Sequence, residues 1–251
     1  MTMIDWIVQS RCVLACTLLA AALPVRAQTV TRQAPGAAID RTMRPLPVHV
    51  GGRVEIVPAG PARQAYRYRW PGIYFEAAFR GDRLAFRLED AEVDYRLLID
   101  AAPAIGLAAG PAADIVISGL PTATHHVRLE KVSESDRAVG RFDGFFVPRD
   151  ARPLPAKRRA RQIEFIGDSS MTGYGMRSDT ISCVGSQAYR RADTPAAYPA
   201  LTAAYFGADY QVNARSGRGL VRNYAGSLPG QAMTAIYPTL HAGVGPAYHD
   251  A

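Results

Sequence analysis

The segment RQIEFIGDSSMTGYG, Arg161–Gly175, joins a short apolar run to an abrupt polar turn. The run IEFI ends at once in Gly-Asp-Ser, and two further glycines follow. This pattern predicts a buried β-strand that ends in a strand-to-helix turn. Two interpretations of the turn are open. In the first, Asp168 or Ser169 caps the first turn of a helix, because their side chains accept hydrogen bonds from free N–H groups. In the second, Ser169 is a nucleophile.

The sequence after this turn favours the second interpretation. It predicts a helix over Pro195–Phe206 and a second buried strand in ADYQVNARSG, residues 208–217. A strand, a helix and a strand in this order form a parallel unit with a right-handed crossover. Ligands gather at the carboxyl ends of such strands, where Gly-Asp-Ser and Ser216–Gly219 both lie. Backbone N–H groups of the two turns would then face one spot and stabilise an oxyanion beside Ser169.

Before this unit, the chain has the texture of an all-β domain. Alternating apolar and polar residues recur in eight short segments between His49 and Pro148: GRVEIV, AYRYRW, IYFEAAF, RLAFRLE, YRLLID, ADIVIS, HHVRLEKV and FDGFFV. Such strands without a helical run predict a β-sandwich of jelly-roll type over residues 48–148. Aromatic residues of these strands, Trp70 and Tyr74 among them, are expected in its core. We expect a flexible lead-in over 28–47, a linker over 149–160, and a second domain over 161–251.

The first 27 residues read as a secretory signal peptide. An apolar segment from Cys12 to Leu23 follows Arg11 and precedes Val25-Arg26-Ala27, a small-residue cleavage site. This segment is too short to cross the roughly 30 Å hydrocarbon layer, which needs about 20 residues. The sequence therefore predicts a secreted or periplasmic protein without a membrane anchor after cleavage. Only Cys183 would remain, so no intramolecular disulfide is expected.

The charge and the residue types narrow the partners. The formal net charge is +7, but the arginines are scattered singly rather than clustered, and an exported protein rarely meets nucleic acid. Adjacent strand residues face opposite sides, so His125 and His126 do not form a metal site. We expect no nucleic-acid partner, no cofactor and no metal. The sequence leaves the oligomeric state open.

The two turns resemble a known family. IEFIGDSSMTGYG is similar to the first block of the SGNH, or GDSL-type, hydrolases, and VNARSG is similar to their second block. The closer resemblance is to carbohydrate esterase family two, the acetyl xylan esterase-like enzymes that place a jelly-roll domain before the SGNH domain. Its segments are matched in order by RYRWPGIYFEAAFRG, RFDGFFVP, KRRARQIEFIGDS, SGRGLVRNYAGS and IYPTL, from about His49 to Leu240.

The resemblance implies a fold and a reaction. The second domain would be an incomplete α/β SGNH-hydrolase domain with a flavodoxin-like parallel sheet. Ser169 would be the nucleophile, and the N–H groups of Ser169 and Gly217 would be the oxyanion donors. The substrate would be an acetylated plant polysaccharide or oligosaccharide, and the enzyme a carboxylic ester hydrolase.

The sequence also departs from the family. Ser170 and Met171 replace an aliphatic residue and a threonine behind the nucleophile. The G-x-N-D block is absent, and none of the five histidines has an aspartate three residues earlier, as the D-x-x-H block requires. A serine without a base is a weak nucleophile, so we expect a truncated esterase with little or no activity. His241 or His249 could substitute as the base, but we expect both to be solvated side chains. The alternative function is a non-catalytic protein that binds carbohydrate through its β-sandwich.

Overall fold

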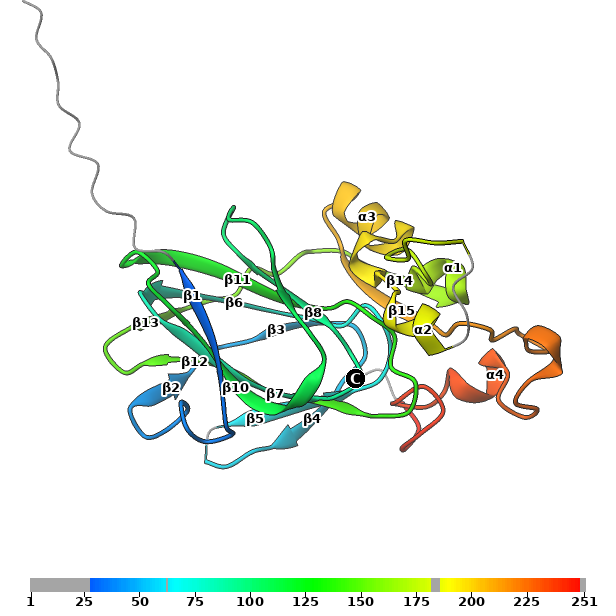
Figure 1. The fold of residues 1–251 in the computed structure, drawn as a ribbon, viewed down its shortest axis with the longest axis horizontal. Coiled ribbons are helices and arrows are strands. Elements are labelled where there is room, and N and C mark those ends of the chain that lie inside the picture. The colour runs from blue at the N-terminus through cyan, green and yellow to red at the C-terminus, as the bar shows by residue number, and fades with distance from the viewer. Residues whose placement is uncertain (1–27, 62, 182–185, 249–251) are drawn as a thin grey trace, which may run out of the picture.

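The computed structural model describes residues 28–61, 63–181 and 186–248. Within these ranges the chain builds two antiparallel sheets and a smaller parallel pair of strands. The antiparallel sheets lie at one end of the molecule, and the parallel pair and the helices lie at the other (Figure 1). The expected signal peptide, residues 1–27, and Cys183 fall outside the described residues. No helix in the described ranges is both long and apolar enough to cross a bilayer.

The first sheet has the strand order β1-β10-β7-β12-β5-β4, and β2 also pairs with β12. All of these pairs are antiparallel. Its strands are β1 (Thr29–Gln33), β2 (Met43–Pro45), β4 (Glu55–Pro58), β5 (Gln64–Tyr68), β7 (Leu84–Asp90), β10 (Gly110–Ser118) and β12 (Gly140–Pro148).

The second sheet has the order β13-β6-β11-β8-β9, with β3 on β6. The alternation read from the sequence appears here as alternating burial, for example in β8, where every second side chain is buried. Its strands are β3 (His49–Gly51), β6 (Tyr74–Gly81), β8 (Tyr95–Ile99), β9 (Ile105–Leu107), β11 (Ala123–Lys131) and β13 (Arg152–Leu154).

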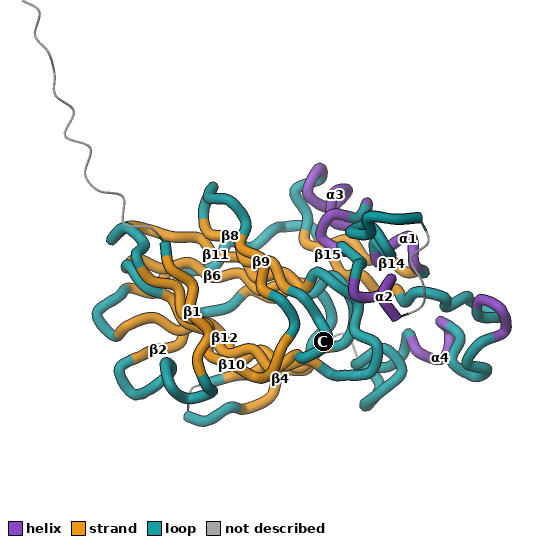
Figure 2. Tube along the Cα trace, viewed as in Figure 1, coloured by secondary structure: helices purple, strands orange, loops and turns teal. Residues whose placement is uncertain are grey.

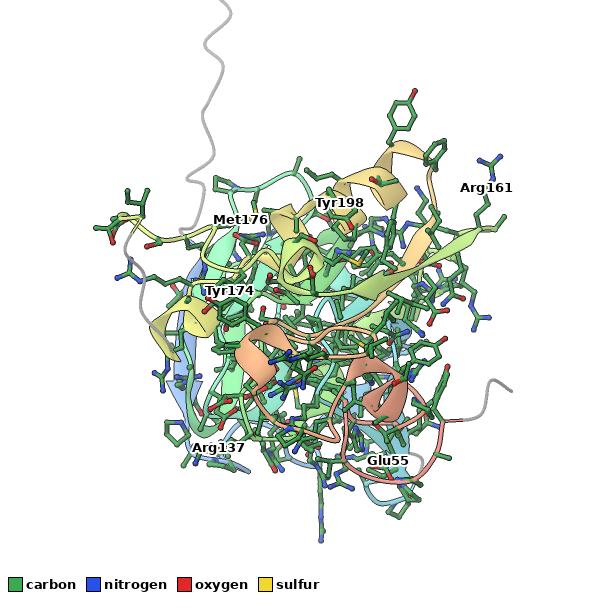
Figure 3. All side chains as sticks on the ribbon, turned by 90° about the vertical axis from the view of Figure 1, so that its right-hand side faces the viewer. Glu55, Arg137, Arg161, Tyr174, Met176 and Tyr198 are labelled. Carbon is green, nitrogen blue, oxygen red and sulfur yellow. The ribbon has the colours of Figure 1, made fainter. Side chains whose placement is uncertain are left out.

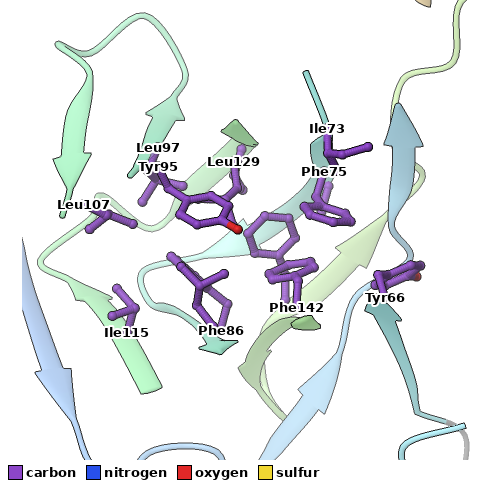
Figure 4. Packing of buried hydrophobic residues seen from close by; sticks show 14 of the residues in the cluster. Tyr66, Ile73, Phe75, Phe86, Tyr95, Leu97, Leu107, Ile115, Leu129 and Phe142 are labelled. Atoms are coloured by element: carbon purple, nitrogen blue, oxygen red, sulfur yellow. The ribbon is translucent and has the colours of Figure 1, made fainter. Parts of the chain in front are cut away.

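An aromatic core joins the two sheets. The rings of Phe75, from the second sheet, and Phe142, from the first, stack with centroids 4.3 Å apart (Figure 4). Each such buried side chain contributes roughly 2–3 kcal/mol through removal of apolar surface from water. Trp70 is fully buried in this core, as expected, whereas Tyr74 is fully buried between the sandwich and β15, Asp209–Ala214. The architecture is therefore β-sandwich-like, as predicted, whereas the jelly-roll connectivity stays a prediction.

Two segments expected to be irregular form strands instead. The lead-in over 28–47 contains β1 and β2, and the linker over 149–160 contains β13, which pairs with β6. All five side chains of β1 are exposed, so it has no alternation of burial, and β2 and β13 are only three residues long. Strands of this kind are held by backbone hydrogen bonds to a neighbour distant in sequence, which a local pattern cannot reveal.

The parallel pair is formed by β14 (Gln162–Gly167) and β15 (Asp209–Ala214), with helix α3 (Tyr198–Tyr205) between them in sequence. This confirms the predicted strand-helix-strand order. All six residues of β15 are buried, as expected. The burial predicted for β14 is wrong, since Ile166 is 43% exposed. Among the described residues β14 pairs only with β15, so it forms an edge whose outer face lacks cover.

Short helices surround this pair (Figure 2). Asp168 and Asp193 cap two of them through their side chains, as expected for acidic residues at helix starts. Besides α3, the helical segments are α1 (Ser169–Thr172), α2 (Ser186–Arg190), the 3₁₀ turns at Thr194–Ala196 and Tyr224–Gly226, and α4 (Met233–Ile236), of which α1 and Thr194–Ala196 are the two capped segments.

The last described residues return to the sandwich. Met233 and Ile236 of α4 are buried and belong to the same apolar cluster as the sandwich core. Arg53, which is 2% exposed, donates hydrogen bonds to the carbonyls of Tyr237 and Thr239. The guanidinium of Arg53 also lies 3.9 Å from the ring centroid of Tyr248. Packing and hydrogen bonds thus fasten this segment to the β-domain.

Candidate active site

The register of the parallel pair brings the two unusual turns together. Gly167, the last residue of β14, pairs with Ala214, the last residue of β15. One residue later, the N–H of Arg215 donates a hydrogen bond of 3.2 Å to the carbonyl of Gly167. Both strands therefore end at the same level, and the turns that follow leave the sheet at the same carboxyl edge, as the sequence predicts.

A pocket of about 720 Å³ opens at this edge. It contains both predicted site residues, Ser169 and Gly217, so the structure brings them together. The molecule is viewed from this end in Figure 3, where the pocket residue Tyr174 is labelled. The pocket is lined by Asp168, Ser169, Tyr174, Tyr189, Ser216, Gly217, Arg218, Gly219, Arg222, Tyr224, Ser227 and Leu228.

The first turn separates the capping role from the role of the serine. Asp168 Oδ1 accepts hydrogen bonds from the N–H of Ser170 at 3.1 Å and from its hydroxyl at 3.0 Å. Asp168 is therefore the N-cap of α1 and fixes the turn, while Ser169 is the first residue of the helix. Ser169 is half-buried and lines the pocket, where its hydroxyl can meet a bound molecule.

Two backbone donors at the pocket are free. Within the described part of the chain, the N–H groups of Ser169 and Gly217 donate to no protein acceptor. Gly217 has a φ of 77°, in the left-handed region that favours glycine. A Cβ atom at this position would contact only Tyr224, at 3.9 Å. The glycine is thus required by the backbone conformation of the turn rather than by a crowded approach.

The charge of the lining is positive on balance. Arg218 and Arg222 face one carboxylate, Asp168, which is already engaged by Ser170. Arg218 is 8% exposed, and its one side-chain hydrogen bond in the described residues is to Gln231, at 3.5 Å. Burial lowers the pKa of Arg218, and repulsion from Arg215 lowers it further. The arginines are placed to donate hydrogen bonds to oxygen atoms of a bound molecule.

None of the described histidines lines this pocket. His49 Nε2 lies 3.0 Å from Asp209 Oδ1, and His125 Nδ1 lies 2.7 Å from Asp100 Oδ2. His126 is exposed on strand β11, and His249 lies outside the described residues.

His241 differs from the expectation of a solvated side chain. It is 3% exposed, and its Nε2 lies 3.0 Å from Glu55 Oε2 in β4. No local pattern predicts this burial, because the segment that carries His241 packs on strands nearly two hundred residues earlier.

One cluster has the donor types of a metal site. Ligand atoms of His49, Glu76 and Asp209 lie within 4.8 Å of one another. However, Arg159 donates hydrogen bonds to both Glu76 Oε2 at 2.9 Å and Asp209 Oδ1 at 2.6 Å. The guanidinium thus supplies the positive charge that these carboxylates require, and the cluster is an ion-pair network between the sandwich and β15.

Comparison with known proteins agrees with this arrangement. Residues 50–156 match the family model described as carbohydrate esterase 2 N-terminal. This part of the chain is therefore similar to the N-terminal part of carbohydrate esterase 2 proteins. This confirms the resemblance read from the sequence.

Individual relatives cover both parts of the chain. An acetylxylan esterase / glucomannan deacetylase of Cellvibrio japonicus is 40% identical over 215 residues, which are 85% of this chain and 59% of that protein. The cellulase/esterase CelE of Acetivibrio thermocellus is 29% identical over 67% of this chain and 21% of its own length. This chain thus spans about three fifths of the Cellvibrio protein.

Solved structures give the same result. A carbohydrate esterase structure described as displaying divergent catalytic and non-catalytic binding functions has a TM-score of 0.75 and 38% identity, over 82% of this chain and 61% of that one. A family two carbohydrate esterase from Clostridium thermocellum in complex with cellohexaose has a TM-score of 0.68 and 26% identity, over 81% and 61%.

Several pocket residues were missed by the sequence analysis. Tyr174, Tyr189 and Tyr224 line the pocket from three different segments. Tyr174 and Tyr224 lie within the family-like segments IEFIGDSSMTGYG and SGRGLVRNYAGS, but no role was predicted for them, and Tyr189 lies in neither segment. Glu134, from the sandwich, reaches the second turn through hydrogen bonds to Ser216. A tyrosine in a loop or a carboxylate in another domain carries no local signal, so these residues could be found only in the folded chain.

Proposed function

We propose that this chain is an exported serine ester hydrolase that removes acetyl groups from plant cell-wall polysaccharide or oligosaccharide. The proposal rests on one observation: Ser169 and Gly217 line the same pocket, so the Ser169 hydroxyl lies in a pocket with two free backbone N–H groups, those of Ser169 and Gly217. The kinship with carbohydrate esterases supports acetylated carbohydrate as the partner. The composition of residues 1–27 supports export.

The reaction would be an acyl transfer. The hydroxyl oxygen of Ser169 attacks the acetyl carbonyl, and the carbonyl oxygen gains the negative charge. The N–H groups of Ser169 and Gly217 stabilise that charge, since donors fixed in advance cost no reorganisation when the reaction occurs. The carbon–oxygen bond to the sugar then breaks, the sugar hydroxyl takes up a proton, and water hydrolyses the acetyl-serine.

The sugar would lie against the open side of the pocket. Tyr174, Tyr189 and Tyr224 provide ring faces, and Arg218 and Arg222 provide N–H donors. Tyr224 is 82% exposed, as expected for a residue at the rim of a pocket that binds a sugar. Aromatic faces pack on the apolar faces of sugar rings, while arginines bind the hydroxyl oxygens.

The base for Ser169 is the weak point of the proposed enzyme. A serine hydroxyl needs a group that takes its proton, and no described histidine lines the pocket. Loss of one member of a catalytic triad typically lowers the rate on the order of ten thousandfold. We therefore propose that the chain by itself is a weak or inactive esterase.

This same feature favours one alternative, a non-catalytic protein that binds carbohydrate. A groove of about 760 Å³ on the sandwich, lined by Leu46, Ile56, Arg63 and Tyr66 among others, offers a separate surface for a glycan. In a similar solved structure, the active site of a carbohydrate esterase is described as displaying divergent catalytic and non-catalytic binding functions, so a non-catalytic binding function has been described for a similar protein.

External imidazole distinguishes the two functions. Imidazole supplies the missing base in solution, so acetate release from p-nitrophenyl acetate should gain a component that requires both imidazole and Ser169. Subtraction of the rate of the Ser169→Ala variant removes the direct reaction of imidazole with the ester. Ser170→Ala serves as the matched control, because Ser170 does not line the pocket and its N–H still bonds to Asp168 after the substitution. Equal rates for the chain and Ser169→Ala, together with cello- or xylo-oligosaccharide binding that survives the substitution, would favour the binding protein.

A further inference from the structure

A carboxylate of the sandwich reaches the catalytic edge of the parallel pair. Glu134 lies in the loop between β11 and β12 and is 2% exposed. Its Oε1 accepts a hydrogen bond of 2.9 Å from the N–H of Ser216, and its Oε2 accepts one of 2.6 Å from the hydroxyl of the same residue. Ser216 immediately precedes Gly217, so Glu134 holds the turn that presents the second oxyanion donor.

The contact continues to the first turn. The hydroxyls of Ser216 and Thr172 lie 3.0 Å apart, and the Thr172 hydroxyl donates a hydrogen bond of 3.1 Å to the carbonyl of Ser169. Thr172 is fully buried, and its own carbonyl accepts a bond of 2.8 Å from Thr194. Close contact between the Ser216 and Thr172 hydroxyls thus connects the turn held by Glu134 with the turn that carries Ser169.

A second set of contacts runs in the opposite direction. Arg215, beside Ser216, donates hydrogen bonds to the carbonyls of Ser135 at 3.1 Å and Asp136 at 2.6 Å. The loop of the sandwich therefore holds the turn through Glu134, and the turn holds the loop through Arg215. The positive charge of Arg215 also offsets the negative charge that Glu134 brings near the oxyanion position.

Glu134 is buried, so it is not a charged residue that merely keeps the surface hydrated. A carboxylate taken out of water loses several kcal/mol of hydration, which hydrogen bonds and nearby cations must replace. Burial raises the pKa of Glu134, while the bonds from Ser216 and the charges of Arg215 and Lys131 oppose that rise. A buried carboxylate is costly if it serves packing alone. Its hydrogen bonds to Ser216 suit it to fix a backbone turn.

We infer that Glu134 is a positioning residue for the oxyanion site, through which the β-sandwich controls the orientation of the Gly217 N–H. The inference rests on the proposed function of Ser169 and Gly217. It assigns the sandwich a part in the chemistry in addition to any binding of glycan. Glu134 itself does not touch the reacting atoms.

A boronic acid tests this role without requiring a base in the protein. Methylboronic acid and the Ser169 hydroxyl form a B–O bond, giving an anionic tetrahedral adduct at serine, and the hydroxyl proton passes to the buffer. The adduct is an anionic tetrahedral group, and it places one of its hydroxyl oxygens where the oxyanion donors act. Its affinity, measured by ¹¹B NMR on the full 251-residue chain, therefore reports the quality of the oxyanion site.

The variants separate positioning from folding. Glu134→Ala should weaken boronate binding about tenfold to a hundredfold, because removal of a single oxyanion donor typically costs on the order of a hundredfold. Glu134→Gln keeps an acceptor for the Ser216 N–H and should recover part of the affinity. Glu92→Gln is the matched control, since Glu92 accepts three backbone bonds from Asp136, Arg137 and Ala138 without touching Ser216. It should leave boronate affinity unchanged.

The outcomes are distinct. Unchanged affinity in a folded Glu134→Ala protein overturns the positioning role and leaves the proposed function standing. If Glu134→Ala does not fold, Ser216→Ala replaces it, with a several-fold loss expected and unchanged affinity overturning the inference. Failure of the unsubstituted chain to form any adduct overturns the assignment of Ser169, and this inference with it.

Discussion

The hydroxyl of Tyr74, in strand β6 of the sandwich, donates a hydrogen bond of 2.6 Å to Oδ1 of Asp209 at the start of β15. Arg159 donates to the same oxygen at 2.6 Å, and Arg128 lies 3.6 Å from the centroid of the Tyr74 ring. Tyr74 also packs against Tyr210 with ring centroids 4.9 Å apart. The parallel pair is therefore attached to the sandwich by aromatic packing and by shared carboxylate contacts.

The first prediction concerns this attachment. Asp209→Asn removes the charge that Arg159 and Tyr74 contact, and should lower the free energy of unfolding at pH 7 by about 2 kcal/mol, since hydrogen bonds to charged groups contribute roughly 1.5–3 kcal/mol. Urea unfolding followed by tyrosine fluorescence measures this change. Asp179→Asn is the control, because Asp179 is an exposed partner of Arg191, and such surface pairs contribute at most about 1 kcal/mol. A larger effect at Asp179 than at Asp209 would refute the attachment.

The same carboxylate predicts a pH dependence. Burial raises the pKa of Asp209, but the hydrogen bonds from Tyr74, His49 and Arg159 outweigh burial, and the net shift is downward. An acid whose pKa is lowered by folding stabilises the fold above its unfolded pKa, near 3.9, and loses that contribution as the pH falls through the folded value. As the pH falls, the free energy of unfolding should therefore decrease less steeply in Asp209→Asn than in the unsubstituted chain. Identical acid profiles would contradict this.

His241 should act in a different pH window. Burial lowers its pKa, although Glu55 partly opposes this. A base whose pKa is lowered by folding is neutral in the fold, so its stabilising contribution is present above the unfolded pKa of about 6.5 and is lost as the pH falls below it. The free energy of unfolding should fall between pH 7 and pH 5, and less steeply in His241→Gln. His126→Gln, at an exposed site, is the comparison and should keep the full slope.

Gly217 gives a prediction about the site itself. Its φ of 77° strains any residue with a side chain, so Gly217→Val should distort the turn and lower the Ser169-dependent rate, and Gly217→Ala should do so less. Space is not the reason, because a Cβ atom there has an ordinary contact at 3.9 Å. Gly207→Ala is the control. Gly207 has a φ of 59°, open space around it and a position outside the pocket, so this substitution should cost similar stability without loss of rate. Equal rate losses at both glycines would argue against a role for Gly217 in the reaction.

The two parts of the chain should differ in resistance to protease. β14 is an edge strand with exposed Ile166, and Arg222 lies exposed in the segment after the second turn. Limited trypsin digestion should therefore cleave first in the region that follows Arg161, at sites such as Arg222, and only later within the sandwich. Mass spectrometry of the early fragments identifies the sites. A first cut inside the strands of the sandwich would show that the β-domain is the weaker part.

Local patterns in the sequence were sufficient wherever burial follows the chain. Alternation in segments such as YRLLID predicted β8, and the residues around the Gly-Asp-Ser turn predicted the strand that places Ser169 at the sheet edge. The exposed β1 could not be predicted in the same way, because its partner β10 lies more than seventy residues later and its side chains show no alternation.

The parts of the site that depend on distant contacts were also beyond the sequence. Glu134 contacts Ser216 across a separation of 82 residues, and its burial results from the packing of the second turn on the sandwich. His241 is buried for a similar reason, by packing on Glu55 and its neighbours in the sandwich. Both residues are polar, and a local pattern assigns polar residues in loops to the surface.

The central claim is that Ser169 is the nucleophile of an acetyl esterase. It is tested most directly in an extended version of the chain that carries the family's G-x-N-D and D-x-x-H blocks and hence a base. Acetate release from acetylated xylo-oligosaccharide should be at least about a thousandfold faster in this version than in the 251-residue chain. Ser169→Ala in the extended version should lower that rate on the order of ten thousandfold while circular dichroism shows an unchanged fold. Acetate release that persists in the Ser169→Ala variant would contradict the assignment of the nucleophile.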